Sequence, residues 1–520
     1  MLAKGARKHR RKLVNIEPYS RDDVFWHEVI SLLGQEAVDK AVDDGTDLDA
    51  PFSFREELEL DIQRLSSNGE GLAIAPGLKR PWVIIVPFSL PGEKIRARIY
   101  RNARLHSYAD FLGVELPNLS MRDMSRVNCK YFEECGGCQY QMLSYENQLD
   151  VKRDVVVNAY GTFSGLPSSL APIVLPTAPS PLQYGYRTKI TPHFDAPVKL
   201  RRHQKKKSAP VPEPLPEGKT VAIGFNKVGT REVLDIEECP IATAVINKSL
   251  GPLRKEILSK LHTYKKGVSL LLRDSLVIPE GGIDTTLTSD EHVCVTNHRG
   301  KVREKVSDML FEFNASSFFQ NNNSVLVPLV EYVKEAIFPF SSTTDAEAST
   351  KQTSAPTHLV DAYCGAGLFS IMLSPYFQII AGIELSSESI MAATHNSQLN
   401  NLPTGKVTFR AGDAAHIFET VPDFPPAGTA VIIDPPRKGC DENFLDQLLE
   451  FKSATVVYVS CNVHTQARDI GMLLRKSANE VEKGVETRKY SLESVRGFDL
   501  FPQTAHVESV AVLRLIQSDA

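Results

Sequence analysis

The chain has 520 residues, of which 42% are apolar and 23% are charged, and its formal net charge is −4. This length allows roughly two to four domains with substantial cores. Because the net charge is close to zero, the protein as a whole does not attract nucleic acid, and a nucleic-acid partner would have to bind local basic patches. No apolar run approaches the ~20 residues that cross a bilayer, the N-terminus lacks a signal-peptide core, and the cysteines lack the spacing of a secreted disulfide framework. We therefore expect an intracellular protein without a membrane segment.

Residues 1–60 are predicted to form a basic N-terminal extension that includes helical segments within Asp22–Asp43. Its Lys4–Lys12 run (KGARKHRRK), like the later run Arg201–Lys207 (RRHQKKK), either contacts nucleic acid or is a solvated, disordered stretch. An acidic residue follows the first run as early as Glu17, which disfavours a mitochondrial presequence. The sequence therefore favours a cytoplasmic or nuclear location.

Short strands and turns characterise residues 61–118. The apolar stretch Trp82–Val86 and the alternating stretch Ile95–Ile99 are separated by a Leu-Pro-Gly-Glu turn at 90–93. This pattern of short strands and turns is typical of a small OB-like β-barrel that binds oligonucleotides. The alternative is a β extension that only packs against its neighbour.

A cysteine cluster marks residues 119–312, which we expect to form a central α+β domain. Three cysteines lie close together in the sequence and a fourth follows in a Cys-Pro pair: Cys129, Cys135, Cys138 and Cys239. Four thiolates can hold an iron–sulfur cluster or a zinc ion. Cysteines that bind no metal remain the third alternative.

In residues 313–520, segments with the pattern of strands alternate with segments that have the pattern of helices. The exception is 341–357 (SSTTDAEASTKQTSAPT), which has the composition of a flexible loop. Such alternation predicts βαβ units and a mainly parallel, Rossmann-like sheet.

A ligand-binding turn is predicted where the first strand of this domain ends. Gly365-Ala366-Gly367 opens into a helix, where backbone can approach a ligand without a side-chain clash. The second strand ends at Glu384, a position that binds ribose hydroxyls in Rossmann-type sheets. The third ends near Asp413, which is suited to an adenine amino group. Three such strand ends in series predict an S-adenosylmethionine pocket rather than isolated turn residues.

The fourth strand runs into Asp434-Pro435-Pro436-Arg437. The two prolines fix the backbone, so the Asp434 carboxylate is held where ligands bind in this class of fold. Methyltransferases that act on exocyclic amines usually carry an aromatic residue after the Pro-Pro pair. The arginine at 437 argues against amine methylation.

Two further strand ends carry reactive groups. Cys461 follows the apolar run Ala454–Val459, and Glu508 precedes the run Val510–Ile516. A thiolate that adds to C6 of uracil makes C5 nucleophilic, and a base must then remove the C5 proton, so one Cys and one carboxylate suit methylation of uracil C5. The alternative for Cys461 is an inert core cysteine.

Several motifs together carry a family resemblance. The series DAYCGAG, GIE, DPPRKG, SCN and FPQTAHVE resembles the TrmA/RumA family of RNA uracil-5-methyltransferases in its eukaryotic branch, over roughly residues 61–520. The Asn314–Asn322 segment (NASSFFQNN) is similar to the family segment whose glutamine contacts the methyl donor. The fold that this resemblance implies is a class I S-adenosylmethionine-dependent methyltransferase domain, preceded by a TRAM-type RNA-binding barrel.

The resemblance also implies roles for individual residues. Donor contacts would come from Gln320, Tyr363, Glu384 and Asp434, with Cys461 as nucleophile and Glu508 as base. One departure is Leu368, where bacterial members commonly have Asn, and it puts one polar donor contact in question. The cysteine spacing is similar to that of ribosomal-RNA members that bear a [4Fe-4S] cluster.

The eukaryotic branch implies uridine 54 in the T-loop of tRNA as the substrate, through 5-methyluridine formation. The alternatives are a ribosomal-RNA uridine, an RNA-binding or RNA-folding protein with a vestigial enzyme domain, and a cytosine-5 methyltransferase. The vestigial alternative predicts loss of the nucleophile or the base, and this chain has both. No obligate protein partner is evident from the sequence.

Overall fold

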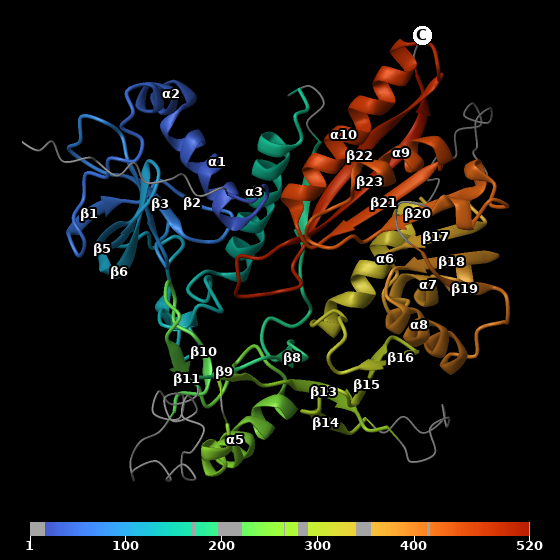
Figure 1. The fold of residues 1–520 in the computed structure, drawn as a ribbon, viewed down its shortest axis with the longest axis horizontal. Coiled ribbons are helices and arrows are strands. Elements are labelled where there is room, and N and C mark those ends of the chain that lie inside the picture. Colours follow the sequence, from blue (N-terminus) through green and yellow to red (C-terminus); the bar gives the residue numbers. More distant parts are fainter. Residues whose placement is uncertain are drawn as a thin grey trace, which may run out of the picture. The chain divides into compact units, whose positions relative to one another are not determined.

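The computed structural model describes residues 16–167, 172–195, 221–264, 266–278, 290–339, 355–412 and 417–518 (Figure 1). Internal contacts divide the chain into two units, one formed by residues 1–126 with 142–144 and the other by 127–141 with 145–520. The runs Lys4–Lys12 and Arg201–Lys207 and most of segment 341–357 lie outside the described residues. No helix in the described ranges is long and apolar enough to cross a membrane.

From residue 16 onward, where the structure describes it, the first unit contains two α-helices and one sheet. The predicted helical segments are confirmed as α1 (Arg21–Leu33) and α2 (Gln35–Asp43). Six strands form the sheet in the order β1-β5-β6-β4-β3-β2: β1 (Glu57–Asp61), β2 (Arg64–Leu65), β3 (Gly71–Ile74), β4 (Val83–Val86), β5 (Lys94–Asn102) and β6 (His106–Leu116). The sheet thus begins at 57, and both helices belong to the same unit rather than to a separate extension.

An eight-stranded sheet forms the centre of the second unit, in the order β19-β18-β17-β20-β21-β23-β22-β7. Its strands are β7 (Val174–Ala178), β17 (His358–Ala362), β18 (Ile379–Glu384), β19 (Val407–Ala411), β20 (Thr429–Ile433), β21 (Thr455–Ser460), β22 (Arg488–Phe498) and β23 (Glu508–Gln517). β17 to β21 are mutually parallel, and β23 is antiparallel to both of its neighbours. The mainly parallel sheet is confirmed.

Helices cover both faces of this sheet: α3 (Tyr145–Phe163), α6 (Leu326–Ile337), α7 (Leu368–Met372), α8 (Ser387–Leu399), α9 (Glu442–Phe451) and α10 (Val463–Glu482) (Figure 1). Alternate residues of β17, such as Val360 and Leu359, pack into different clusters: the first with α3, α9 and α10, the second with α6 and α7. A strand covered on both faces is apolar throughout, which explains continuous runs such as β20.

The central region differs from its expected limits. Its α3 and β7 complete the large sheet, and α3 crosses α10 so closely that a Cβ at Gly471 would lie 1.8 Å from the Ser164 carbonyl oxygen. Residues 119–312 are therefore not a separate domain, and the boundary at 312/313 does not divide the structure.

In the rest of the central region, the described residues form the helix α5 (Ala244–Ser259) and small sheets. Their strands are β8 (Lys189–Ile190), β9 (His193–Phe194), β10 (Gly224–Asn226), β11 (Val233–Asp235), β12 (Val268–Ser269), β13 (Leu272–Leu276), β14 (His292–Val295), β15 (Lys301–Val306) and β16 (Met309–Asn314).

Candidate active site

The turn after β17 has the strained backbone that its glycines predict. Tyr363, Gly365 and Gly367 all have positive φ, at 63°, 54° and 90°. A Cβ at Gly367 would lie 3.0 Å from the ring of Phe409, so the space as well as the φ angle requires glycine there. The turn therefore exposes main chain at the carboxyl end of the sheet, where ligands bind in open α/β folds.

Asp361 fixes this turn from inside β17. Its Oδ2 accepts hydrogen bonds from the Ser370 backbone N–H at 2.9 Å and from the Ser370 hydroxyl at 2.5 Å. Its Oδ1 is buried without a hydrogen-bond partner among the described residues. Burial raises the pKa of Asp361 to about 7, although the Ser370 hydrogen bonds oppose the shift. Asp361 begins the DAYCGAG motif but received no individual role from the sequence; an acid within an apolar strand was the signal that could have identified that role.

Two of the predicted acids lie at the ends of β18 and β20, the strands on either side of β17. Glu384 accepts hydrogen bonds from the backbone N–H groups of Gly365 (3.2 Å) and Ser386 (2.9 Å), so the turn and the carboxylate hold each other. Asp434 follows β20 directly, and burial together with Asp361 and Glu384 raises its pKa to about 7. This concentration of buried acids favours a cationic ligand, because a cation stabilises their ionised forms.

The other predicted donor contacts have different surroundings. Gln320 is buried in the segment after β16, and the half-buried Tyr363 ring has its centroid 5.7 Å from that of Phe444. Asp413 lies outside the described residues. Their contacts to a donor stay predictions.

Strand register brings Cys461 and Glu508 together. β21 and β23 are antiparallel with Ser460 opposite Ser509, and the next residue along each strand toward this end of the sheet is Cys461 on one and Glu508 on the other. Cys461 is half-buried, whereas Glu508 is only 4% exposed. Cross-strand neighbours lie within side-chain reach of each other. The thiol and the carboxyl group are therefore adjacent at the carboxyl end of β21.

Burial and neighbouring carboxyl groups oppose ionisation of both members of this pair. Burial, Glu508 and Asp434 raise the pKa of the Cys461 thiol to about 12. Burial and Asp434 raise the pKa of Glu508 well above its ordinary value. The guanidinium of Arg437 opposes both shifts. The loop that carries Arg437 is held beside the nucleophile, because its carbonyl oxygen accepts a hydrogen bond from Asn462 Nδ2 at 2.9 Å.

Aromatic side chains near Glu508 divide into two kinds. Phe498 is 1% exposed and packs edge-on against Tyr332 at 5.3 Å, so it is a core residue rather than a base-stacking one. Phe501 is half-buried, with the Arg187 guanidinium 5.5 Å from its ring centroid and the His506 ring at 5.0 Å. Burial lowers the pKa of His506 to about 3, so its imidazole is neutral at physiological pH.

The four predicted metal ligands are half-buried and influence one another electrostatically. Burial raises the pKa values of Cys129, Cys135, Cys138 and Cys239, and nearby thiols contribute to the shift of Cys138. Within the described ranges, no group of three or more His, Cys, Asp or Glu side chains is disposed to hold a metal ion. The structure thus gives the cluster no support, and it stays a prediction from the sequence.

Comparison with known proteins gives one consistent result. A family model described as tRNA (Uracil-5-)-methyltransferase matches residues 293–516. The tRNA (uracil(54)-C(5))-methyltransferase of Schizosaccharomyces pombe is 40% identical, over 99% of this chain and 89% of that protein. The protein of the same name from Saccharomyces cerevisiae is 36% identical, over 97% of this chain and 80% of that protein.

Among solved structures, the tRNA (uracil-54, C5)-methyltransferase of Pyrococcus abyssi in complex with S-adenosyl-L-homocysteine aligns with a TM-score of 0.58 at 22% identity, over 88% of this chain and 99% of that chain. This likeness confirms the predicted methyltransferase fold.

Proposed function

Since the chain belongs to the family of tRNA (uracil-5-)-methyltransferases, we propose that it transfers a methyl group from S-adenosylmethionine to C5 of uridine 54 in tRNA. The observation that carries the proposal is the strand register that sets Cys461 beside Glu508, with the carboxyl group of Asp434 close enough to raise the pKa of both. The relatives from Schizosaccharomyces pombe and Saccharomyces cerevisiae are named for this reaction.

The reaction assigns one role to each member of the pair. The Cys461 thiolate forms an S–C6 bond with the uracil, and the C5=C6 electrons move toward the C4 oxygen. The enolate electrons then form a bond from C5 to the methyl group on the donor's positively charged sulfur, while the sulfur–methyl bond breaks and its electrons stay on sulfur, which leaves neutral S-adenosylhomocysteine. Glu508 then takes the C5 proton, the C5=C6 bond re-forms and the S–C6 bond breaks, which returns the thiolate. Arg437 stabilises the anionic forms of both residues.

The acids at this end of the sheet fit the donor because the donor is a cation. Asp361, Glu384 and Asp434 would hold it, with the glycine turn offering main-chain contacts to its nucleoside part.

Donor affinity should therefore depend on pH. Because Asp361 and Asp434 have pKa values of about 7 in the free protein, both ionise between pH 6 and pH 8. A cation favours the ionised acids, so the affinity for S-adenosylmethionine should rise by about tenfold over this interval. Calorimetric titration of the protein with S-adenosylmethionine at pH 6 and at pH 8 measures the two affinities.

S-adenosylhomocysteine serves as the control for that titration, since it keeps the amino-acid and adenosine groups but lacks the charge on sulfur. Its affinity should rise less over the same interval. Equal pH dependence of the two ligands would contradict the assignment of these acids to the sulfonium.

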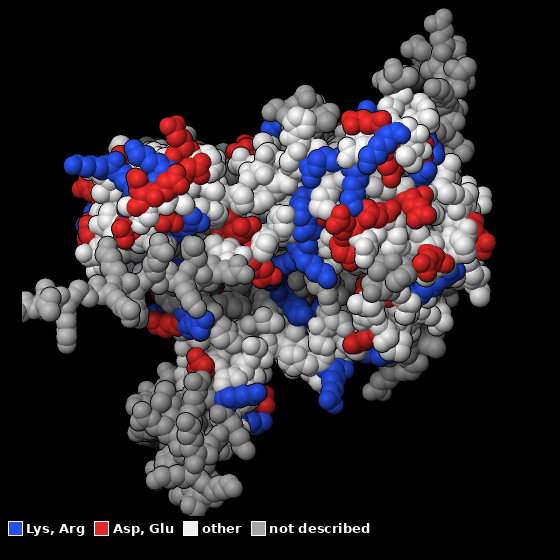
Figure 2. All heavy atoms as spheres, turned by 45° about the horizontal axis from the view of Figure 1, so that its top comes forward, with Lys and Arg blue, Asp and Glu red and all other residues white. Residues whose placement is uncertain are grey.

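The RNA surface is proposed on two grounds. The first unit would act as the TRAM-type domain, where the exposed Arg101 guanidinium, 3.9 Å from the centroid of the buried Tyr108 ring, offers a cation to a phosphate group. Figure 2 shows a band of Lys and Arg side chains on the viewed face, as a phosphate backbone would require. Action on tRNA accords with a cytoplasmic or nuclear location.

The test uses tRNA that contains 5-fluorouridine. Fluorine cannot leave as a proton, so the enzyme should remain bound through Cys461 and migrate as a protein–RNA adduct on a denaturing gel. An adduct that maps to uridine 54 supports reaction, nucleophile and substrate together. An adduct with ribosomal RNA alone would identify ribosomal RNA as the substrate in place of tRNA. If protein that binds the donor formed no adduct with either RNA, the proposal would be refuted.

A further inference from the structure

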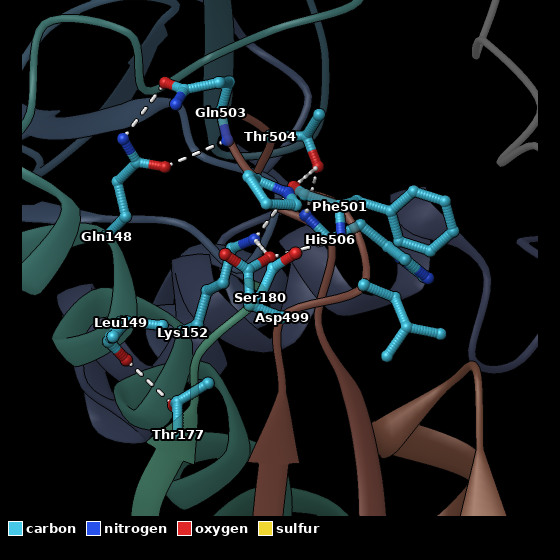
Figure 3. A network of polar contacts seen from close by, with 12 residues as sticks. Gln148, Leu149, Lys152, Thr177, Ser180, Asp499, Phe501, Gln503, Thr504 and His506 are labelled. Carbon is cyan, nitrogen blue, oxygen red and sulfur yellow. Dashed lines mark hydrogen bonds and ion pairs between the residues drawn. The ribbon is translucent and has the colours of Figure 1, made fainter. Parts of the chain in front are cut away.

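The loop between β22 and β23, residues 499–507, ends at the proposed base Glu508. Asp499 begins the loop and is fully buried with Lys152 of α3, whose Nζ contacts Asp499 Oδ1 and donates a hydrogen bond to the Phe501 carbonyl oxygen at 3.0 Å (Figure 3). Removal of one partner from a buried ion pair is strongly destabilising, since it leaves an uncompensated charge. The first half of the loop is therefore fixed to α3.

Gln148, one helical turn before Lys152, holds the centre of the same loop. Gln148 Oε1 accepts a hydrogen bond from the Gln503 backbone N–H at 2.9 Å, and Gln148 Nε2 donates to Gln503 Oε1 at 3.1 Å (Figure 3). Gln503 has a φ of 72°, a conformation that non-glycine residues adopt only when their surroundings impose it. Gln148 is one of those surroundings, and it is 2% exposed.

The segment after Cys138 supplies the third attachment. The backbone N–H groups of Gln139 and Tyr140 both donate to the Gln503 carbonyl oxygen, at 2.9 and 3.0 Å. Gln139 Oε1 also accepts from the Ala505 N–H at 3.1 Å. The last of these bonds lies three residues before Glu508. Gln503 is thus the point at which α3 and the cysteine-bearing segment meet on the loop.

None of the loop's hydrogen bonds to Gln148, Gln139 and Tyr140 involves Cys461. It follows β21, and its neighbour Asn462 caps α10 by accepting a hydrogen bond from the His464 N–H at 3.2 Å. The nucleophile and the base therefore stand on supports that can be altered separately.

We propose that Gln148 is a positioning residue that sets the place of Glu508, and so controls proton removal from C5 without controlling formation of the Cys461 adduct. This inference rests on the proposed function. The step concerned starts from the adduct in which C6 is bonded to Cys461 sulfur and C5 carries both the new methyl group and a proton. Glu508 takes that proton, the electrons of the C5–H bond form C5=C6, and the S–C6 bond breaks.

The experiment follows both steps in one single-turnover assay with full-length protein, S-adenosylmethionine and tRNA tritiated at uracil C5. Tritium release reports proton removal, and the band of covalent RNA on a denaturing gel reports the adduct. Gln148→Ala should form the adduct within about twofold of the unaltered protein and release tritium about tenfold more slowly, since displaced general bases lose rate on this scale. Its adduct band should therefore accumulate.

Two more variants keep the result interpretable. Gln139→Ala removes the partly exposed contact to Ala505, endangers folding less, and should shift the ratio of the two rates in the same direction by a smaller factor. Thr177→Val is the matched control: it removes a 2.9 Å hydrogen bond from Thr177 Oγ1 to the Leu149 carbonyl oxygen of α3 without touching the loop, and should keep the unaltered ratio.

The outcomes separate the possible explanations. The positioning role would be overturned if Gln148→Ala left the ratio of tritium release to adduct formation unchanged, for example by slowing both steps equally. It would also be overturned if Thr177→Val shifted this ratio by the same factor as Gln148→Ala. If the unaltered protein itself neither traps 5-fluorouridine tRNA nor releases tritium, the proposed function fails instead.

Discussion

Replacement of Cys461 by alanine should abolish methyl transfer and adduct formation while donor binding stays intact. Without the thiolate, C5 of uracil remains a poor nucleophile, and loss of a covalent nucleophile commonly lowers turnover by roughly 10⁴-fold or more. Donor binding should persist because the acids that face the donor lie at other strand ends. Methyl transfer is measured by tritium release from tRNA, and adduct formation by a denaturing gel with 5-fluorouridine tRNA. Donor binding is measured by calorimetry.

Cys294→Ala is the matched control for this variant, because Cys294 is also half-buried but lies in β14, away from the reactive pair. It should retain full activity. Retained methylation in Cys461→Ala would refute the covalent mechanism. A Cys461→Ala protein that still remodels tRNA would show an RNA-folding role beside catalysis.

Glu508→Gln should convert the enzyme into a trap for ordinary tRNA. Glutamine has nearly the same size as the buried glutamate but accepts no proton, so the methylated adduct should form and then persist. General-base removal slows turnover by about 10²- to 10⁴-fold. The measurement is a denaturing gel with unmodified tRNA and donor, on which the variant should show a stable covalent band.

The control for this prediction is Glu304→Gln, since burial also raises the pKa of Glu304 to about 7 but the residue lies in β15. It should release its product normally. If Glu508→Gln turned over as fast as the unaltered protein, another group would have to be the base.

The strands that carry most of the site could be predicted from the sequence, because several functional residues stand at the end of an apolar run that folds as a strand. Glu384, Asp434 and Cys461 all stand where such a run ends. Cys461 and Glu508 were predicted to share one site as nucleophile and base. Their position opposite one another across β21 and β23 was not predicted, since it depends on the register between strands whose order in the sheet differs from their order in the chain.

Long-range attachments escaped prediction for the same physical reason. Gln148 and Gln503 are 355 positions apart, and neither has a local pattern that distinguishes it from a surface glutamine. The domain boundary at 312 was wrong because α3 and β7 pack against strands that come much later in the chain. Asp361 received no role from the sequence because it lies within β17 rather than at its end, where ligand-binding acids are expected.

The position of β23 has a consequence for biosynthesis. This strand inserts between β21 and β22, both of which precede it in the sequence, so a growing chain that has reached residue 498 has an unfilled slot in its sheet. The apolar edge of β21 stays open to wrong partners until residues 508–517 emerge. Nascent chains paused in this interval should be targets for chaperones, and their reactive cysteine should be alkylated faster than in the finished enzyme.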